Sequence, residues 1–278
     1  MRYKLMPSFI AAGHQASITA GFPLVARCDL YWPQYAEASS NHQYVHLNET
    51  LVAPGFYVGR GGYQGGKGPL NQSVWIPPGQ WKGVWSGETT TGPRMLNVTS
   101  VPSRMPMWHR AGGLLILASE SRLRVDEQDW SRLILEVHLP TFEFYTRGGG
   151  SQIPTTTRTL FERETGARTE IAMTMRAGVA NGTVVVGLQI GQAEDRRSRA
   201  WTVRLHMPPL ASIVGATTDG SSTRDFTMLE PVSSDSSGDF LPFGGVGARP
   251  APLGGHVAEV ELRASQIART AEFLVARS

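Results

Sequence analysis

The chain has 278 residues, of which 41% are hydrophobic and 18% charged, a composition typical of a folded globular protein rather than a disordered one. The formal net charge is only +3 and no run of Lys or Arg stands out, which argues against a nucleic-acid partner. No apolar stretch approaches the roughly 18 residues that a membrane-spanning helix needs, so we expect no transmembrane segment.

The first 30 residues read as one helix followed by one strand. Residues 3–20 predict a helix, because four apolar residues fall on one face: Leu5, Phe9, Ala12 and Ala16. Gly21 follows, where glycine commonly ends a helix. The apolar run at residues 22–28 is typical of a strand buried on both faces of a parallel sheet. This single helix–strand step does not recur along the chain.

After residue 50 the pattern changes to short strands separated by Gly, Pro, Asn and Asp. Three segments alternate with a period of two, as half-buried strands do. Their apolar residues are Leu133, Leu135, Val137 and Leu139, then Trp201, Val203, Leu205 and Met207, then Ala258, Val260 and Leu262. Many short strands of this kind are typical of antiparallel sandwiches. We therefore expect a mainly β fold with two antiparallel β-sandwich domains.

Two short patterns resemble ligand-binding motifs but lack essential parts. Residues 61–67 have the glycine and lysine spacing of a phosphate-binding loop, yet Gly-Pro follows instead of the Ser or Thr and the helix that the motif requires. His42 and His46 have i, i+4 spacing, but no third ligand lies nearby and no Glu stands between them. We therefore predict surface or packed histidines, no metal site and no cofactor.

The single cysteine, Cys28, lies in an apolar run and has no partner for an internal disulfide. We expect a buried thiol of the core rather than a nucleophile. Because the chain has no G-x-S-x-G segment, nothing favours a serine nucleophile either.

Four of the five asparagines stand in Asn-x-Ser/Thr triplets and are candidate N-glycosylation acceptors: Asn48, Asn71, Asn97 and Asn181. They indicate a protein of the secretory lumen or the extracellular space. The alternative is that a Ser/Thr-rich sequence forms such triplets by accident. The first residues lack the charged and apolar regions of a signal peptide, so we expect no secretory signal in this chain.

Three stretches, taken in order, carry a family resemblance: RYKLMP, HQA and GFPL within residues 2–24, NHQY and ETLVAP within 41–54, and VWIPPGQW, WSG and RMPMWHRAGG within 74–113. They are similar, respectively, to the last helix and strand of the catalytic barrel, to the segment that leaves the barrel, and to the adjoining β domain of glycoside hydrolase family 31. His42 and Asn48 depart from the family pattern, which usually has acidic residues and Gly-Asp there.

The resemblance implies a domain division. Residues 1–43 would be a remnant of the TIM barrel with one helix and one strand, residues 44–125 a proximal β-sandwich, and residues 126–278 a distal β-sandwich. The residues of the segment at 104–113 predict a structural role, with Met105, Met107 and Leu114 as core contacts; the alternative is that Arg104 or Arg110 faces the barrel and pairs with a carboxylate there.

The resemblance also implies a retaining glycosidase that hydrolyses O-glycosyl bonds of α-glucosides, with an α-linked glucoside or oligosaccharide bound through the barrel. Such enzymes use two carboxyl groups. The family's "WxDMNE"-type motif does not occur here. Six acidic residues of this chain match none of the family's catalytic motifs: Asp29, Glu37, Glu49, Asp126, Glu127 and Asp129. We therefore assign no catalytic residue and expect this chain alone to be inactive.

The alternative is a non-catalytic carbohydrate-binding or structural β-sandwich module, in which exposed aromatic rings stack on sugars. Against it, four tryptophans read as core residues between sheets: Trp75, Trp81, Trp85 and Trp108. A barrel helix and strand would also have no use in such a module.

Overall fold

The computed structural model describes residues 3–19, 23–40, 42–55, 70–100, 104–146, 152–161, 168–178, 183–192, 200–208, 211–218, 221–222, 228–229, 257–263 and 269–277. The chain forms two compact units. Phe22–Ala111 is called the hairpin unit, and Met1–Gly21 together with Gly112–Ser278 is called the sandwich unit. The units divide at other positions than the predicted domain limits, because the first helix and the strand at 114–118 both belong to the sandwich unit.

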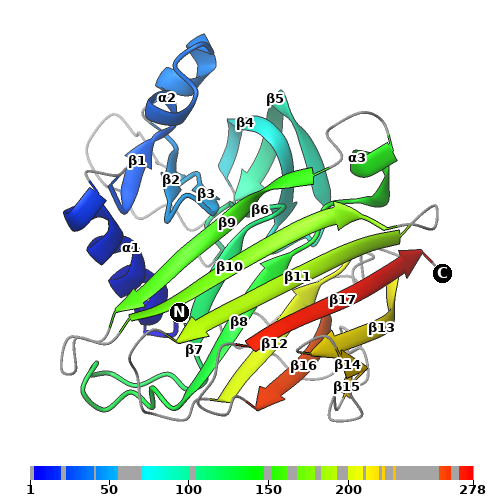
Figure 1. Ribbon diagram of the computed structural model, residues 1–278. Helices are drawn as coiled ribbons and strands as arrows, with labels where there is room; N and C mark the ends of the chain where they lie inside the picture. Colours follow the sequence, from blue (N-terminus) through cyan, green and yellow to red (C-terminus); the bar gives the residue numbers. More distant parts are fainter. Residues whose placement is uncertain are drawn as a thin grey trace. The chain divides into compact units, whose positions relative to one another are not determined.

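The hairpin unit is built on one sheet with the strand order β1-β2-β3-β6-β4-β5. Its strands are β1 (Val25–Arg27), β2 (Tyr44–His46), β3 (Thr50–Val52), β4 (Leu70–Gly83), β5 (Thr89–Ser100) and β6 (Met107–Arg110). A short helix, α2 (Cys28–Tyr31), and a 3-10 turn (Ala36–Ser39) follow β1. The neighbouring strands all pair antiparallel, and β4 with β5 forms the longest hairpin (Figure 1).

Tryptophan rings occupy the core of the hairpin unit. Trp32 meets Trp75 and Trp81 edge to face, with ring centroids 6.0 and 6.1 Å apart. The indole of Trp81 is fully buried and donates a hydrogen bond of 3.0 Å to the carbonyl of Pro77. This arrangement satisfies the polar atom of a large apolar side chain inside the core.

The predicted strand at 22–28 is shorter and more exposed than expected. Only Val25–Arg27 is a strand, and it pairs antiparallel with β2. Ala26 is buried, but Val25 is half exposed and Arg27 reaches Asp29 at 2.7 Å. The expectation of burial on both faces is therefore wrong, because this strand lies at the end of an antiparallel sheet.

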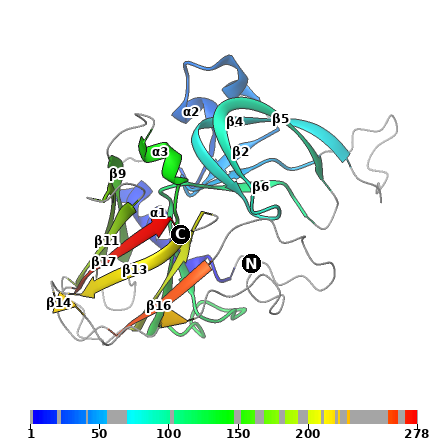
Figure 2. The ribbon, with the colours of Figure 1, turned by 90° about the vertical axis from the view of Figure 1, so that its right-hand side faces the viewer.

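The sandwich unit contains two sheets. The first has the order β14-β13-β17-β11-β10-β9 and the second has the order β15-β16-β12-β8-β7. The strands are β7 (Leu114–Ala118), β8 (Arg132–His138), β9 (Gln152–Phe161), β10 (Arg168–Ala177), β11 (Thr183–Gln192), β12 (Ala200–His206), β13 (Ala211–Thr218), β14 (Ser221–Ser222), β15 (Met228–Leu229), β16 (Val257–Arg263) and β17 (Arg269–Arg277). Figure 2 shows β11, β17 and β13 of the first sheet side by side.

Alternating residues of the two sheets form one continuous core. From the second sheet come Leu133, Leu135 and Val137 of β8 and Trp201, Val203 and Leu205 of β12; from the first come Met173, Val186 and Phe273, among others. The predicted inward faces at 133–139 and 201–207 are therefore confirmed. For residues 258–262 the strand is confirmed, while the directions of their side chains lie outside the described residues.

One strand pair departs from the antiparallel pattern. β8 and β12 run parallel, with Leu133 opposite Trp201 and Val137 opposite Leu205. A parallel pair needs a crossover connection, and here the connection passes through three strands of the other sheet, β9, β10 and β11. Because of this register, Glu136 lies opposite Arg204, and His138 lies opposite His206.

The first helix, α1 (Met6–Thr19), covers an open edge of the sandwich unit. It contacts β7 and β9, which are edge strands of the two sheets among the described strands (Figure 1). The helix begins at Met6, so Pro7 stands in its first turn, where proline is tolerated. Its buried residues are Pro7, Ser8 and Ala11, whereas Phe9 and Ala12 of the predicted apolar face are only half-buried, because the helix packs on the edge strands β7 and β9.

Strands dominate both units, and the prediction of a mainly β fold with antiparallel sheets is confirmed. Within the described ranges, none of the three sheets closes into a barrel. α3 (Phe142–Thr146) completes the helices of the sandwich unit. In the described part of the chain, none of the helices has the length and apolar character needed to cross a membrane.

Candidate functional site

Four ionisable side chains gather on the face of the second sheet that points away from the sandwich core. β8 supplies Glu136 and His138, and β12 supplies Arg204 and His206. The parallel register places Glu136 opposite Arg204 and His138 opposite His206. Because the intervening residues face the sandwich core, these four side chains must project from the opposite face. We call them the Glu136 cluster.

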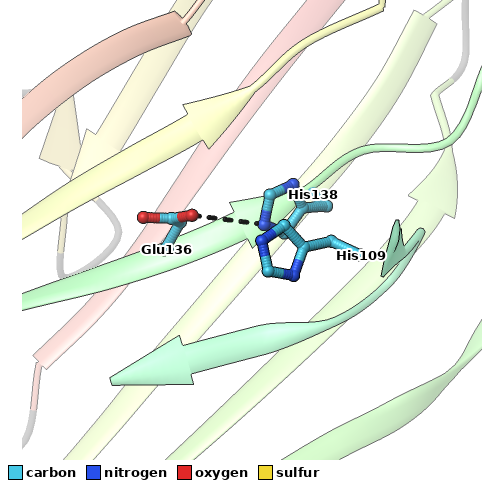
Figure 3. A group of neighbouring side chains, drawn as sticks. All are labelled: His109, Glu136 and His138. Carbon is cyan, nitrogen blue, oxygen red and sulfur yellow. Dashed lines mark ion pairs between the residues drawn. The ribbon is translucent and has the colours of Figure 1, made fainter. Parts of the chain in front are cut away.

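The carboxylate of Glu136 lies at the centre of this cluster. Its Oε1 is 3.4 Å from Nε2 of His138 (Figure 3) and 3.2 Å from Nε2 of His206. Its Oε2 is 3.6 Å from a guanidinium nitrogen of Arg204. The two imidazole rings stack on each other, with centroids 4.3 Å apart and planes 22° from parallel.

Backbone hydrogen bonds hold the two histidines in place. The carbonyl of His138 accepts a bond of 2.8 Å from the amide of Gly112, and the carbonyl of His206 accepts one of 3.0 Å from the amide of Leu139. The ends of β8 and β12 are thus tied to the chain segments beside them, which fixes the geometry of the cluster.

The electrostatics of the cluster keep Glu136 ionised. Its exposed fraction is 1%, and burial by itself would raise its pKa. The charge and hydrogen bonding of His206 and His138 outweigh burial and hold the pKa of Glu136 well below its ordinary value. The guanidinium of Arg204 lies 3.6 Å from Oε2, so each oxygen of the buried carboxylate has a basic side chain nearby.

This arrangement suits structure rather than glycosidic chemistry. A general acid needs a carboxyl that is protonated near neutral pH and reaches the leaving oxygen of the sugar. Glu136 has the opposite shift and is closed off from solvent. We therefore interpret the cluster as a set of ion pairs that stabilises the pairing of the parallel strands β8 and β12.

The sequence analysis missed this cluster. His138 and His206 lie far apart in the chain, and their spacing matches no ligand pattern. A signal was nevertheless present, because both strands place charged or imidazole residues at alternate positions between apolar ones: Leu-Glu-Val-His at 135–138 and Val-Arg-Leu-His at 203–206. Polar residues that match in two strands are the pattern of neighbours across a ladder.

Several acidic residues that resemble no catalytic motif are engaged in local contacts. Asp29 pairs with Arg27, and Asp126 pairs with Arg124 and lies on the surface. Asp129 accepts one hydrogen bond from the hydroxyl of Ser131 and another, of 2.9 Å, from its amide, and these bonds hold the pKa of Asp129 below its ordinary value. Glu37 and Glu127 are exposed, and Glu49 is buried in the turn between β2 and β3.

The tryptophans proposed for sugar stacking lie mostly inside the hairpin unit. Trp75, Trp81 and Trp108 have exposed fractions of 2%, 0% and 6%. Trp85 is half-buried, and its indole donates to the carbonyl of Met105. The core interpretation is therefore confirmed for three of the four rings.

The segment at 104–113 is also largely structural. Met107 and Leu114 are buried core residues, as predicted, whereas Met105 is 36% exposed and does not join the core. Burial lowers the pKa of Arg110 from its ordinary value, with Tyr31 acting in the opposite direction. Its backbone amide donates to the carbonyl of Glu49, which ties β6 to the turn after β2.

Cys28 behaves as the sequence predicts. Its thiol is fully buried, and burial raises its pKa, with Gln43 opposing that shift through a contact of 3.5 Å. A thiol of this kind is a poor nucleophile. His42 is exposed and His46 is half-buried on β2, so the pair does not stand on a helix.

The candidate glycosylation acceptors lie in three different settings. Asn48 stands in the turn between β2 and β3, and Asn71 and Asn97 are exposed on β4 and β5. Asn181 lies outside the described residues.

The sequence matches no protein-family model, and no curated protein matches it. The fold, in contrast, matches solved structures. A Flavobacterium johnsoniae GH31 dextranase complexed with isomaltotriose aligns with a TM-score of 0.66 and 16% identity, over 98% of this chain and 31% of that one. The cycloalternan-forming enzyme from Listeria monocytogenes aligns with a TM-score of 0.64 and 15% identity, over 98% and 22%.

A third similar structure is the α-1,4-glucan lyase of Gracilariopsis lemaneiformis, with a TM-score of 0.64, 14% identity and coverage of 98% and 27%. The chain therefore spans less than a third of the length of each of these enzymes. Nearly the whole chain has the fold of a segment of GH31 enzymes, and the family resemblance read from the sequence is confirmed at the level of the fold.

Proposed function

We propose that this chain is the C-terminal β portion of a retaining glycoside hydrolase of family 31 that acts on α-glucosides, with the catalytic aspartates outside the chain. The observation that carries this proposal is the match of 98% of the chain to a dextranase that binds isomaltotriose. The ordered motifs at residues 2–24, 41–54 and 74–113 agree with it independently of the fold.

The acids of the described residues support the placement of catalysis elsewhere. A retaining mechanism needs one carboxyl as nucleophile and another as acid and base, about 5–5.5 Å apart and open to the sugar. Glu136 is enclosed and ionised, while Asp29 and Asp126 pair with neighbouring arginines. In this proposal the two units brace a catalytic barrel and do not carry out the reaction.

The alternative is a structural or carbohydrate-binding β module that works without a barrel. One observation favours it: α1, the helix that resembles a barrel element, contacts edge strands of the sandwich unit. Its buried residues therefore pack within this chain, and this packing requires no further barrel strands. The buried indoles of the hairpin unit count against sugar stacking, so the structural form of this alternative is the stronger one.

The proposal is tested by mapping the 5′ end of the transcript and by assaying the purified chain. We expect an upstream reading frame that encodes a "WxDMNE"-type segment, and no turnover of aryl α-glucosides or maltose by the chain alone. A transcript that starts at the codon of Met1, together with an inactive and stable monomer, would favour the structural module. Hydrolysis that persists through purification would contradict the placement of the aspartates outside the chain.

A further inference from the structure

We propose that Asn71 and Asn97 form a paired N-glycosylation site on the β4–β5 hairpin, and that Asn48 is not modified in the folded protein although it stands in the same triplet. This inference does not depend on the proposed enzymatic function. It rests on how the hairpin unit presents three identical sequence signals in different ways.

The two triplets interlock across the hairpin. The antiparallel register places Asn71 opposite Thr99 and Ser73 opposite Asn97. Each acceptor asparagine thus faces the hydroxyl residue of the other triplet. Directly opposed residues of an antiparallel pair project from one face, and all four of these residues are exposed. Both acceptors therefore open to solvent on the same face.

A hydrogen bond orients the acceptor amide of Asn71. The hydroxyl of Thr99 donates to Oδ1 of Asn71 at 2.6 Å. The side-chain amide is planar, so fixing Oδ1 toward β5 turns Nδ2 away from that strand. An N-linked glycan is attached through Nδ2, and so the bond from Thr99 persists after modification.

Asn48 is less exposed than Asn71 and Asn97. It adopts a left-handed conformation with φ 60°, next to Leu47 at φ 57°, in the tight turn between β2 and β3. Its Oδ1 is buried and has no hydrogen-bond partner within the described ranges. The residue as a whole is half-buried, and because Nδ2 shares a carbon with the enclosed Oδ1, we expect the folded turn to leave no room for a glycan there.

A glycan on the hairpin would also have a physical use. β5 is an edge strand of its sheet among the described strands, is 12 residues long, and exposes half of Met95. Long exposed edge strands pair with other chains unless something blocks them. Sugars at Asn71 and Asn97 would stand beside this edge and prevent such pairing.

The modification is a balanced group transfer. A lipid-linked oligosaccharide pyrophosphate donates the sugar: a bond forms between Nδ2 and the anomeric carbon, and the bond from that carbon to the pyrophosphate oxygen breaks. The leaving pyrophosphate takes the electron pair, and Nδ2 loses one proton. No oxidant or reductant is required.

The test expresses the full chain behind a cleavable secretion leader in a glycosylating eukaryotic host. Peptide-N-glycosidase in ¹⁸O-water converts each occupied asparagine to labelled aspartate, which peptide mapping then locates. In the secreted monomer we expect label at Asn71 and Asn97 and none at Asn48. Ser73→Ala should remove one glycan, at Asn71, and Thr99→Val should remove one, at Asn97, whereas Asn41→Gln, at the asparagine outside any triplet, should remove none.

If little protein is secreted, the same mapping on the fraction retained in the endoplasmic reticulum still tests Asn71 and Asn97, because transfer precedes folding. Asn48 is tested on the secreted monomer, since a chain modified there before folding should not form the turn. Unmodified Asn71 and Asn97 in both fractions would overturn the proposal. Label at Asn48 in the secreted monomer would overturn the exclusion of that site. The double variant Asn71→Gln/Asn97→Gln should increase the aggregated share of secreted protein relative to Asn41→Gln.

Discussion

Ser8 of α1 and Ile116 of β7 exchange two hydrogen bonds across 108 residues of sequence. The hydroxyl of Ser8 donates to the carbonyl of Ile116 and accepts from its amide, each at 2.7 Å. The amide of Ala118 donates in addition to the carbonyl of Lys4 at 2.8 Å. One small side chain thereby satisfies both backbone groups of Ile116 on the edge of β7, where they could otherwise pair with another chain.

We expect Ser8→Ala to destabilise the protein by about 1–3 kcal/mol, because the amide and the carbonyl of Ile116 then stay buried without this partner. Urea unfolding followed by circular dichroism measures the change. Ser17→Ala is the matched control, since its exposed hydroxyl donates within the helix, to the carbonyl of His14. Equal losses in the two variants would contradict the role given to the contact between α1 and β7.

The Glu136 cluster predicts a large cost for removing a single charge. Glu136→Gln keeps the shape but leaves Arg204 and two imidazoles without the central carboxylate. Removing one partner of a buried ion pair costs about 3–5 kcal/mol. Glu120→Gln is the control, because its ion pair with Arg122 is more than half exposed and should contribute about 0–1 kcal/mol. If both variants melt together, the cluster does not clamp β8 to β12.

The same cluster predicts a pH dependence with a definite sign. The pKa of Glu136 is depressed in the folded state, so its contribution to stability is fully present above the ordinary carboxyl value of 4.5. It is lost as the pH falls through the folded-state pKa. We therefore expect the gap in melting temperature between the native chain and Glu136→Gln to narrow as the pH falls below 4.5. A gap that widens below pH 4.5 would contradict this assignment.

Two neighbouring methionines provide a test of the β6 segment. Met107 is 3% exposed in the core, whereas Met105 is 36% exposed. Met107→Asp buries an unpaired charge and should lower the free energy of unfolding by several kcal/mol, with a loss of soluble yield. Met105→Asp should change it by about 0.5 kcal/mol or less, as surface substitutions usually do. A comparable loss from Met105→Asp would mean that this side chain packs in the core after all.

Cys28 should react slowly with thiol reagents in the folded chain. Its thiol is fully buried and its pKa is raised by burial, so little thiolate is present or accessible at neutral pH. Labelling with a chromogenic disulfide should give one thiol per chain in denaturant and almost none without it. Rapid labelling of the native protein would show that α2 opens easily.

The sequence by itself determined which residues of β8 and β12 face the core. Alternation at 133–139 and 201–207 predicted the buried faces of β8 and β12, and the apolar surroundings of Cys28 predicted its burial. The ordered motifs predicted the fold that the dextranase and the other enzymes share. These features are local, because side-chain periodicity follows from the geometry of the strand itself.

Only the tertiary structure decided which strands meet. The parallel pairing of β8 with β12 brings Glu136 to Arg204 and His206, and the register of β4 with β5 joins Asn71 to Thr99. Likewise, the buried residues of α1 follow from the edge strand beneath it rather than from its own apolar pattern. Pairing of this kind depends on contacts between distant segments, and hydrophobic periodicity carries no information about the partner that each strand selects.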